Sequence, residues 1–334
     1  MESHNSKTLE SALRLDAIVK YLGVGKHWGG KDSEKEVVHA CLEKMSGLFV
    51  GLEPTGEALA ARTAKHYQVC FEEVRDEEDI TSLEQKYLVG KRELGFARIR
   101  EEIHSPNVDA LLFQRINANP DDLDRWVAVL NLTMTEDRAY WNRYHELSHR
   151  LAEPPQKVLP FRRQLTDDRD VVEKLIDTIA GEVAFHPQLF SPYMRSIRDT
   201  PATFEAISAV RNAYSPSASL LAVTNAIVQR MERPAVAFVA SMKSKRSGPS
   251  DVKDLRIEPQ CRNLLAQESG LFLIRNMRVP FSSCAYHTFL TGCPMTNIEN
   301  TAEWTTSSGR AIPEHRVTVS VIKLNDRIYG IMTI

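Results

Sequence analysis

Apolar residues in the first half of the chain recur at two spacings, and each spacing predicts a different element. Leu9, Leu13 and Leu22 stand close to helical spacing and predict a helix over residues 7–23. The charged stretch 76–79 is predicted to be a solvated turn. Comparable patterns predict helices over 34–45, 56–66, 133–152 and 170–185, and strands over 67–74, 108–116 and 126–132. This mixture of helices and strands indicates an α+β domain.

The second half of the chain begins helical and then becomes rich in strands. Residues 202–231 form a predicted helical block, and the pattern changes after Pro234. Predicted strands cover 235–242, 271–279 and 317–334, with a loop at 243–250 and a turn at Asn325 and Asp326. A stretch marked by Pro and Ser, 186–201, is predicted to hold a domain boundary. The predicted organisation is an N-terminal domain of residues 1–200, a helical linker of residues 201–233 and a C-terminal domain of residues 234–334.

Composition and charge narrow the class of protein without indicating an activity. The 334 residues suffice for about two domains, and a formal net charge of −2 excludes a bulk cationic field for nucleic acid. The start of the chain lacks the layout of a secretory signal, and no apolar run approaches the ~18–20 residues that cross a bilayer. Five cysteines without a CxxC pair indicate reduced thiols. We therefore expect a cytoplasmic protein without a membrane segment.

The sharpest chemical signal is an H-E-x-x-H sequence formed by His145, Glu146 and His149 inside the predicted helix 133–152. Residues four apart lie on one face of a helix, so both imidazoles can reach one metal ion. Glu146 stands beside them, where its carboxylate can accept a proton from water. The alternative interpretation is a pair of solvated histidines on a helix surface.

A zinc site of this kind needs a third protein ligand, and the next predicted helix offers two carboxylates. Glu173 and Asp177 are four residues apart and therefore share a face. One carboxylate could bind zinc while the other fixes the tautomer of a histidine. Hydrolysis also needs a donor for the developing oxyanion, and Tyr140 and Tyr144 lie on the neighbouring face, although core packing is the favoured interpretation of both tyrosines.

Two blocks of sequence resemble the ImmA/IrrE family of metallopeptidases. The run 127–149 resembles that family's edge strand, polar turn and helix with the sequence HELGH, and the second block matches the signature E-x-x-A-N/D-x-F-A-x-E followed by Pro. The matching residues of the second block are Glu173, Asp177, Ala180, Glu182 and Pro187. The resemblance covers about residues 50–190. The chain departs from the pattern at Ser148, Ile176 and Ile179 and by one added residue before Pro187, and none of these departures removes a ligand.

The resemblance implies a zincin-like fold and a single zinc ion, Zn2+, held by His145, His149 and Glu173. It implies Glu146 as the general base, and Asp177 is left to orient a histidine ligand. Zinc would polarise the scissile carbonyl and acidify water. We therefore expect a zinc metallo-endopeptidase.

Members of this family commonly cleave a helix-turn-helix repressor and so switch on a stress or defence operon, and such a repressor is the expected partner. The chain's own helix-turn-helix-like segment is 204–228, with its turn at Tyr214–Ser217. Arg211 is its single strong cation before Arg230, so a role in packing is favoured over the reading of DNA.

The C-terminal region 234–334 resembles the GAF- or PAS-like sensor domains that accompany some family members, including a branch in antiphage defence. The resemblance implies an α/β sensor domain that binds a signal and regulates the protease. A small molecule or a nucleic acid could be that activator. The basic stretches 243–246 and 162–163 could serve a nucleic acid, although solvated charge is the default interpretation.

Two thiols in the C-terminal region suggest a way to hold the enzyme inactive. A thiolate from Cys284 or Cys293 could enter the fourth position on zinc and block access of water. Cys293, between Gly292 and Pro294, is the first candidate for this inhibitory role. The favoured alternative is that both cysteines are buried and inert.

The sequence therefore predicts a regulated zinc endopeptidase that cleaves a transcriptional repressor. Two other classes compete with this prediction. One is a DNA-binding regulator with a vestigial protease fold, and the other is a ligand sensor that docks to a repressor without cutting it.

Overall fold

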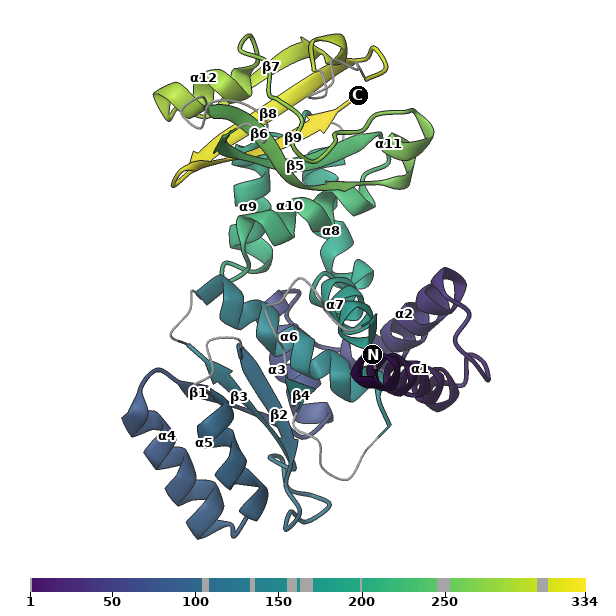
Figure 1. The fold of residues 1–334 in the computed structure, drawn as a ribbon, viewed down its shortest axis with the longest axis vertical. Helices are drawn as coiled ribbons and strands as arrows, with labels where there is room; N and C mark the ends of the chain where they lie inside the picture. The colour runs from purple at the N-terminus through teal and green to yellow at the C-terminus, as the bar shows by residue number, and fades with distance from the viewer. Residues whose placement is uncertain are drawn as a thin grey trace. The chain divides into compact units, whose positions relative to one another are not determined.

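Two separate β-sheets organise the chain (Figure 1). A computed structural model describes residues 2–103, 108–132, 136–154, 161–162, 171–198, 200–244, 253–304 and 312–334. The chain divides into two units, Met1–Leu189 and Phe190–Ile334. The division falls inside helix α8 (Pro187–Arg198). Helices accompany a sheet in both units, which confirms the α+β class.

The N-terminal sheet has four strands in the order β1-β3-β2-β4. They span β1 (Val69–Val74), β2 (Ala110–Gln114), β3 (Trp126–Asn131) and β4 (Phe161–Arg162). Strand β3 pairs in parallel with β1, whereas β2 is antiparallel to both β3 and β4. The expectation of an edge strand before the motif helix is wrong, because β3 lies inside the sheet. Its apolar run buries residues on both faces, as strands in a sheet interior do.

Helices cover both faces of this sheet. On one face, α4 (Glu77–Leu83), a π-helical turn (Glu84–Gly90), a 3-10 turn (Leu94–Phe96) and α5 (Ala97–Ile103) share a hydrophobic cluster with the strands. On the other, α6 (Glu136–Ala152) contacts β2 and β3 and packs against α7 (Val171–Ala184). The helices α1 (Glu2–Leu22), α2 (Lys31–Met45) and α3 (Gly56–His66), with a 3-10 turn at Ser46–Leu48, complete this side. The helices and strands expected here are present.

The expected turn at 76–79 is wrong, because these residues begin helix α4. The Asp76 carboxylate accepts hydrogen bonds from the backbone amides of Glu78 and Asp79 and so caps the helix. Three acidic residues in the first turn match the positive end of the helix dipole. The acidic side chains that suggested a solvated turn therefore stabilise the N-terminus of a helix.

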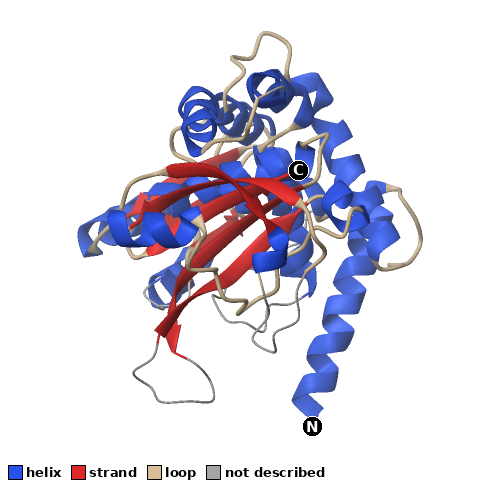
Figure 2. Ribbon diagram, turned by 90° about the horizontal axis from the view of Figure 1, so that it is seen from above, coloured by secondary structure: helices blue, strands red, loops and turns tan. Residues whose placement is uncertain are grey.

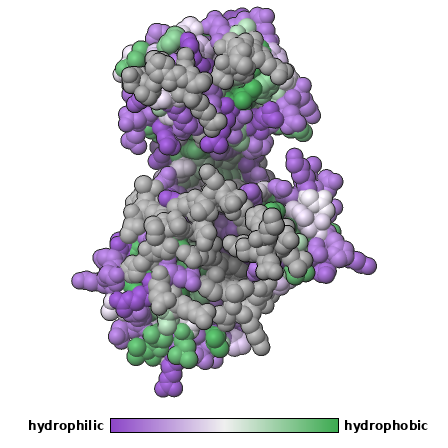
Figure 3. Space-filling view, in the orientation of Figure 1, coloured by the Kyte–Doolittle hydropathy of each residue, from purple (hydrophilic) through white to green (hydrophobic). Residues whose placement is uncertain are grey.

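Exposed apolar side chains gather at one end of the N-terminal unit. The segment that contains Glu93 lies beside the segment that follows β2. The Glu93 carboxylate accepts hydrogen bonds from the backbone amides of Ile116 and Asn117. Val89, Leu94 and Leu123 are exposed on these two segments, as is Ile116. Figure 3 shows a hydrophobic patch at the bottom of this unit, on an otherwise mostly hydrophilic described surface.

The C-terminal sheet has five antiparallel strands in the order β6-β5-β9-β8-β7 (Figure 2). They span β5 (Ala235–Ser244), β6 (Lys253–Arg262), β7 (Met295–Asn300), β8 (Arg316–Leu324) and β9 (Arg327–Thr333). Helices α9 (Phe204–Tyr214) and α10 (Leu220–Arg230) contact the sheet, as do α11 (Leu264–Glu268) and α12 (Cys284–Thr291). A 3-10 turn at Thr301–Glu303 follows β7.

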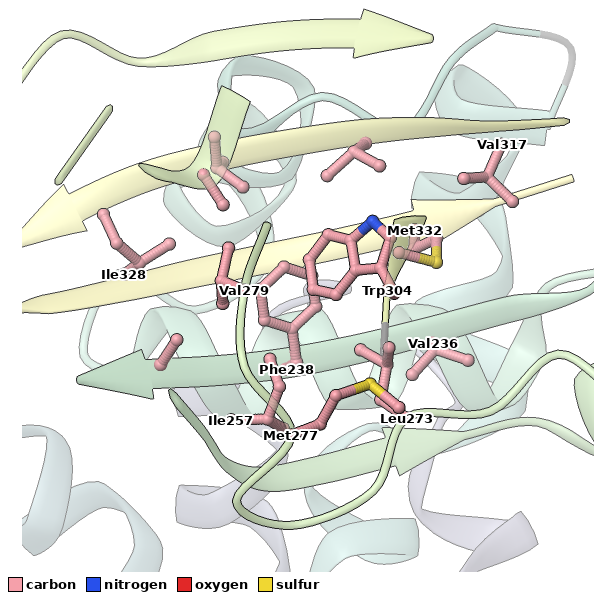
Figure 4. Close-up of a cluster of buried hydrophobic side chains, with 14 of the residues drawn as sticks. Val236, Phe238, Ile257, Leu273, Met277, Val279, Trp304, Val317, Ile328 and Met332 are labelled. Carbon is pink, nitrogen blue, oxygen red and sulfur yellow. The ribbon is translucent and has the colours of Figure 1, made fainter. Parts of the chain in front are cut away.

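A packed apolar cluster fills the centre of this unit (Figure 4). Trp304 is fully buried, and its ring centroid lies 5.7 Å from that of Phe238. Phe238 pairs across the sheet with Gly330, where an added Cβ would come within 2.1 Å of the Phe238 ring. Glycine at position 330 therefore makes room for the phenyl ring, which lies over the neighbouring strand.

The predicted strand at 271–279 is wrong. In this segment the structure has one isolated bridge, Arg278 with Arg256, and Asn276 adopts a positive φ of 69°. Leu273 and Met277 nevertheless reach the core cluster from this irregular segment. Burial of alternate residues produced a strand-like pattern without a regular strand. Strands β6 and β7 and helices α11 and α12 were not predicted.

Some predictions concern residues outside the described part of the chain: 133–135 at the start of the motif helix, Asp170, Arg163, and 245–250 in the loop and basic stretch. Among the described residues, no helix combines the length and apolar character needed to span a bilayer.

Candidate metal centre

Helix α6 brings the two motif histidines together. Their Nε2 atoms lie 3.2 Å apart, and the ring planes meet at 75°. Both side chains are only 1% exposed. The arrangement follows from their spacing of four residues, which places both rings on the face of α6 that packs against α7.

Helix α7 adds the carboxylate of Glu173 to this pair. Glu173 Oε2 lies 3.2 Å from His145 Nε2 and 3.6 Å from His149 Nε2. Each of the three residues offers one ligand atom, and these atoms all lie within 4.8 Å of one another. The structure thus assembles the three residues that the sequence predicts as metal ligands.

The other ring nitrogens face two further carboxylates. Asp177 Oδ1 lies 3.0 Å from His145 Nδ1, and Glu153 Oε2 lies 2.9 Å from His149 Nδ1. An ionised carboxylate only accepts hydrogen bonds, so with neutral imidazoles each Nδ1 carries the proton and each Nε2 presents a lone pair. Two lone pairs and a carboxylate oxygen then point at one place, an arrangement that a cation satisfies.

The separations fit a zinc ion. Two ligands at about 2.1 Å from a tetrahedral zinc lie about 3.4 Å apart, and the three separations here run from 3.2 to 3.6 Å. Two histidines and one glutamate are also a ligand set of catalytic zinc sites, in which the fourth position stays open to water.

The local charges favour a bound cation. Burial disfavours charge on His149, but Glu173 and Glu153 outweigh it and raise the His149 pKa to about 10. Burial is likewise outweighed at His145, where hydrogen bonds with Asp177 and Glu173 raise the pKa. The pKa of Glu173 is lowered, because the adjacent histidines overcome the effect of burial. Without metal, protons supply the positive charge that these carboxylates attract.

Glu146 and two tyrosines lie beside the ligands on α6. Glu146 is 1% exposed and is close enough to His145 to favour its charged form. Tyr140 and Tyr144 are buried, with ring centroids 5.1 Å apart, and the Tyr144 hydroxyl donates a 2.6 Å hydrogen bond to the carbonyl of Gly56. That bond ties α6 to the start of α3 and fits the packing role expected of Tyr144.

Sequence reasoning missed two residues of this centre, Glu153 and Arg14. Glu153 had a usable signal, because it stands four residues after His149, directly past the end of α6, where its backbone amide still donates to the His149 carbonyl. Arg14 had none, since it lies 139 residues before Glu153 yet donates to the Glu153 carboxylate at 2.8 Å. The indole Nε1 of Trp141 on α6 donates to Asp177 Oδ1 on α7 at 3.4 Å, so Asp177 contacts α6 through Trp141 as well as through His145.

The two candidate inhibitory thiols belong to the C-terminal unit and differ in exposure. Cys284 is buried in the apolar cluster, where burial and then Glu299 raise its pKa. A thiol in such surroundings is a poor source of thiolate. Cys293 is exposed. The contrast leaves Cys293 as the more accessible of the two.

The helix-turn-helix-like segment also lies in the C-terminal unit. Helices α9 and α10 contact each other, α9 contacts β8, and α10 contacts β5 and β6. The Ser320 hydroxyl on β8 accepts a hydrogen bond from the backbone amide of Phe204 at the start of α9. Both helices thus cover the sheet, as expected for elements whose role is packing.

Neither protein-family models nor curated proteins show a match to the sequence. Among solved structures, a Mycobacterium tuberculosis transcriptional regulator aligns with a TM-score of 0.43 and 9% sequence identity. The alignment covers 96% of this chain and 81% of that one. Similarity at this level carries no argument about fold or function.

Proposed function

We propose that the N-terminal unit is a zinc-dependent peptidase domain whose metal ion is held by His145, His149 and Glu173. The observation that carries the proposal is the convergence of three electron-pair donors at separations of 3.2 to 3.6 Å. The two flanking carboxylates support it, because Asp177 and Glu153 present the histidines in the tautomer that binds metal.

Peptide hydrolysis then follows from the residues around the ion. Bound zinc would polarise the scissile carbonyl and lower the pKa of water toward ~7. Glu146 takes the proton of the attacking water and passes it to the leaving amine. Burial of Glu146 beside His145 keeps the carboxylate in a site with little bulk water, where its interaction with the reacting atoms is strong.

For the whole chain we propose regulated cleavage of a partner protein, a helix-turn-helix repressor of a stress or defence operon. The resemblance of the sequence to ImmA/IrrE metallopeptidases supports this part. A five-stranded antiparallel sheet with helices packed against it is compatible with a GAF- or PAS-like sensor in the C-terminal unit. The signal would be a small molecule or a nucleic acid, and the expected compartment is the cytoplasm.

The test compares the zinc-loaded full chain with its Glu146→Gln variant on a peptide library made from a digested bacterial proteome. New peptide ends that the wild-type protein produces, and that Glu146→Gln and a zinc chelator both abolish, are the expected result. Zinc content should be equal in the two proteins. A library left intact by the loaded wild-type protein would overturn the proposed peptidase activity.

The competing docking function predicts a different outcome in cells. If the protein acts on a repressor without cutting it, transcription of the controlled operon responds equally to wild type and Glu146→Gln. If proteolysis carries the signal, the response is lost in Glu146→Gln although the protein still binds zinc.

A further inference from the structure

The guanidinium of Arg14, on the N-terminal helix α1, lies at the edge of the candidate metal centre. Arg14 Nη2 lies 2.8 Å and Nε 3.2 Å from Glu153 Oε1, and Nη2 lies 3.7 Å from Glu173 Oε1. Helix α1 contacts α2, α6 and α7, so the guanidinium comes from a packed element. One side chain thus reaches a proposed metal ligand and the carboxylate that orients another ligand.

The two carboxylates divide their oxygens between different partners. Glu153 Oε2 faces His149 Nδ1 at 2.9 Å, while Oε1 accepts from Arg14. Glu173 Oε2 faces the histidine Nε2 atoms, while Oε1 is the oxygen nearest Arg14. The guanidinium therefore hydrogen-bonds the outer oxygen of Glu153 and lies within ion-pair distance of the outer oxygen of Glu173, while the inner oxygens of both carboxylates face the imidazoles.

We propose that Arg14 and Glu153 are a positioning pair for the metal centre, and that they couple the docking of helix α1 to metal occupancy. The inference rests on the proposed metal site. The guanidinium offsets repulsion between two nearby carboxylates and fixes the rotamer in which Glu153 holds His149 Nδ1. By thermodynamic linkage, metal binding then stabilises the docked helix to the extent that the docked helix stabilises metal binding.

Helix α1 offers a matched control in Asp16, two residues after Arg14. The Asp16 carboxylate accepts hydrogen bonds from the backbone amide of Trp28 at 2.7 Å and faces His27 Nδ1 at 3.0 Å. It thus ties α1 to the loop that follows the helix and makes none of its described contacts with the metal centre. Asp16→Asn changes a carboxylate contact of α1 and leaves the Arg14 contacts intact.

The first readout is zinc affinity, measured by competition with a chelator on the full chain. Arg14→Gln and Glu153→Gln should each weaken zinc binding by about 10–100-fold, the range found for residues that orient metal ligands. The double variant should lose less than the product of the two single losses, because both changes remove one interaction. Arg14→Lys should recover part of the affinity, since it keeps the charge without the fork of donors. Asp16→Asn should bind zinc as the wild type does.

The second readout is amide hydrogen exchange in α1 with and without zinc. Zinc should slow exchange in the wild type and in Asp16→Asn but have little effect on α1 in Arg14→Gln. Equal zinc affinity in wild type, Arg14→Gln and Glu153→Gln, or equal protection of α1 in all of them, would overturn the coupling. A wild-type protein that binds no zinc would instead overturn the proposed function on which the coupling rests.

Discussion

The polar cluster around the candidate metal centre and the apolar cluster of the C-terminal unit bury opposite kinds of side chain. In the N-terminal unit, His145, His149 and Glu153 are at most 2% exposed and face one another through polar atoms. In the C-terminal unit, Trp304 and Phe238 are equally buried, but they meet through aromatic rings.

The difference distinguishes polar groups buried at a candidate functional site from apolar groups whose burial stabilises the fold. Buried polar groups are costly unless they find partners, and three electron-pair donors that converge on one place are satisfied by a cation. Buried aromatic rings need only close contact, which the C-terminal cluster supplies. The comparison thus supports the metal chemistry proposed for the polar cluster of the N-terminal unit, and a stabilising role for the apolar cluster of the C-terminal unit.

The largest expected effect comes from removing the proposed base. Glu146→Gln keeps the size of the side chain but removes the proton acceptor, so peptide cleavage should fall by about 10²–10⁴-fold. Metal analysis should still find zinc, because Glu146 is not a proposed ligand. Cleavage at the wild-type rate by Glu146→Gln would contradict the assigned role.

Truncation of Trp304 tests the other centre. Trp304→Ala should lower the free energy of unfolding of the C-terminal unit by about 3–5 kcal/mol, because it leaves a cavity in a packed cluster. Denaturant titration measures the loss, and Ile298→Ala, at a 54% exposed position, is the control with little effect. Zinc stoichiometry should not change. A loss of zinc from Trp304→Ala would show that the two centres are not separable.

Loss of the charge on Asp177, the carboxylate proposed to orient His145, should have a smaller effect. Asp177→Asn keeps the shape but loses the charge that holds the Nδ1 proton, and zinc affinity should fall by about 10–100-fold. Thr178→Ala, one residue further along α7 with a hydroxyl that is bonded to the Lys174 carbonyl, is the control. Unchanged affinity in Asp177→Asn would separate His145 from its proposed partner.

Zinc binding should depend on pH, because protons occupy the metal-free centre. Glu173 and Glu153 raise the His149 pKa to about 10 in the metal-free fold. Protonation therefore stabilises the metal-free fold fully below the unfolded value of about 6.5, and this stabilisation disappears as pH rises toward the folded value. The zinc-induced rise in Tm should accordingly grow from pH 6 to pH 9. A rise that is constant with pH would contradict proton competition.

The thiols should give the smallest effects. Iodoacetamide should modify Cys293 in the native protein and reach Cys284 and Cys41 only after denaturation, because burial raises the pKa of Cys41 to about 12 and also raises the pKa of Cys284. Peptide mapping measures the order. If Cys293 blocks the metal, Cys293→Ser should raise basal cleavage. Unchanged activity in both Cys284→Ser and Cys293→Ser would exclude an inhibitory thiol.

The grouping of the candidate ligands was open to prediction, because these residues follow helix geometry. His145 and His149 are four apart, as are Glu173 and Asp177, and such pairs share a face in any helix. The contact of Arg14 with Glu153 could not be predicted, because it depends on how α1 packs against distant helices and leaves no trace in local spacing.

The elements of the fold likewise differed in how well the sequence predicted them. Elements with a regular apolar period, such as α3 and β3, were predicted within a few residues. The segment 271–279 was not, since its buried side chains follow a strand-like period while a positive φ at Asn276 interrupts the strand. The interior position of β3 was also missed, because strand order is set by packing of the whole sheet.

The most direct test of the central claim is metal analysis of the purified chain and of its His149→Ala variant after exposure to zinc and removal of the excess. The account predicts one zinc ion per wild-type chain, loss of that ion in His149→Ala, and retention in Asp16→Asn. A wild-type chain that retains no zinc under these conditions, or a His149→Ala chain that retains it fully, would contradict the account.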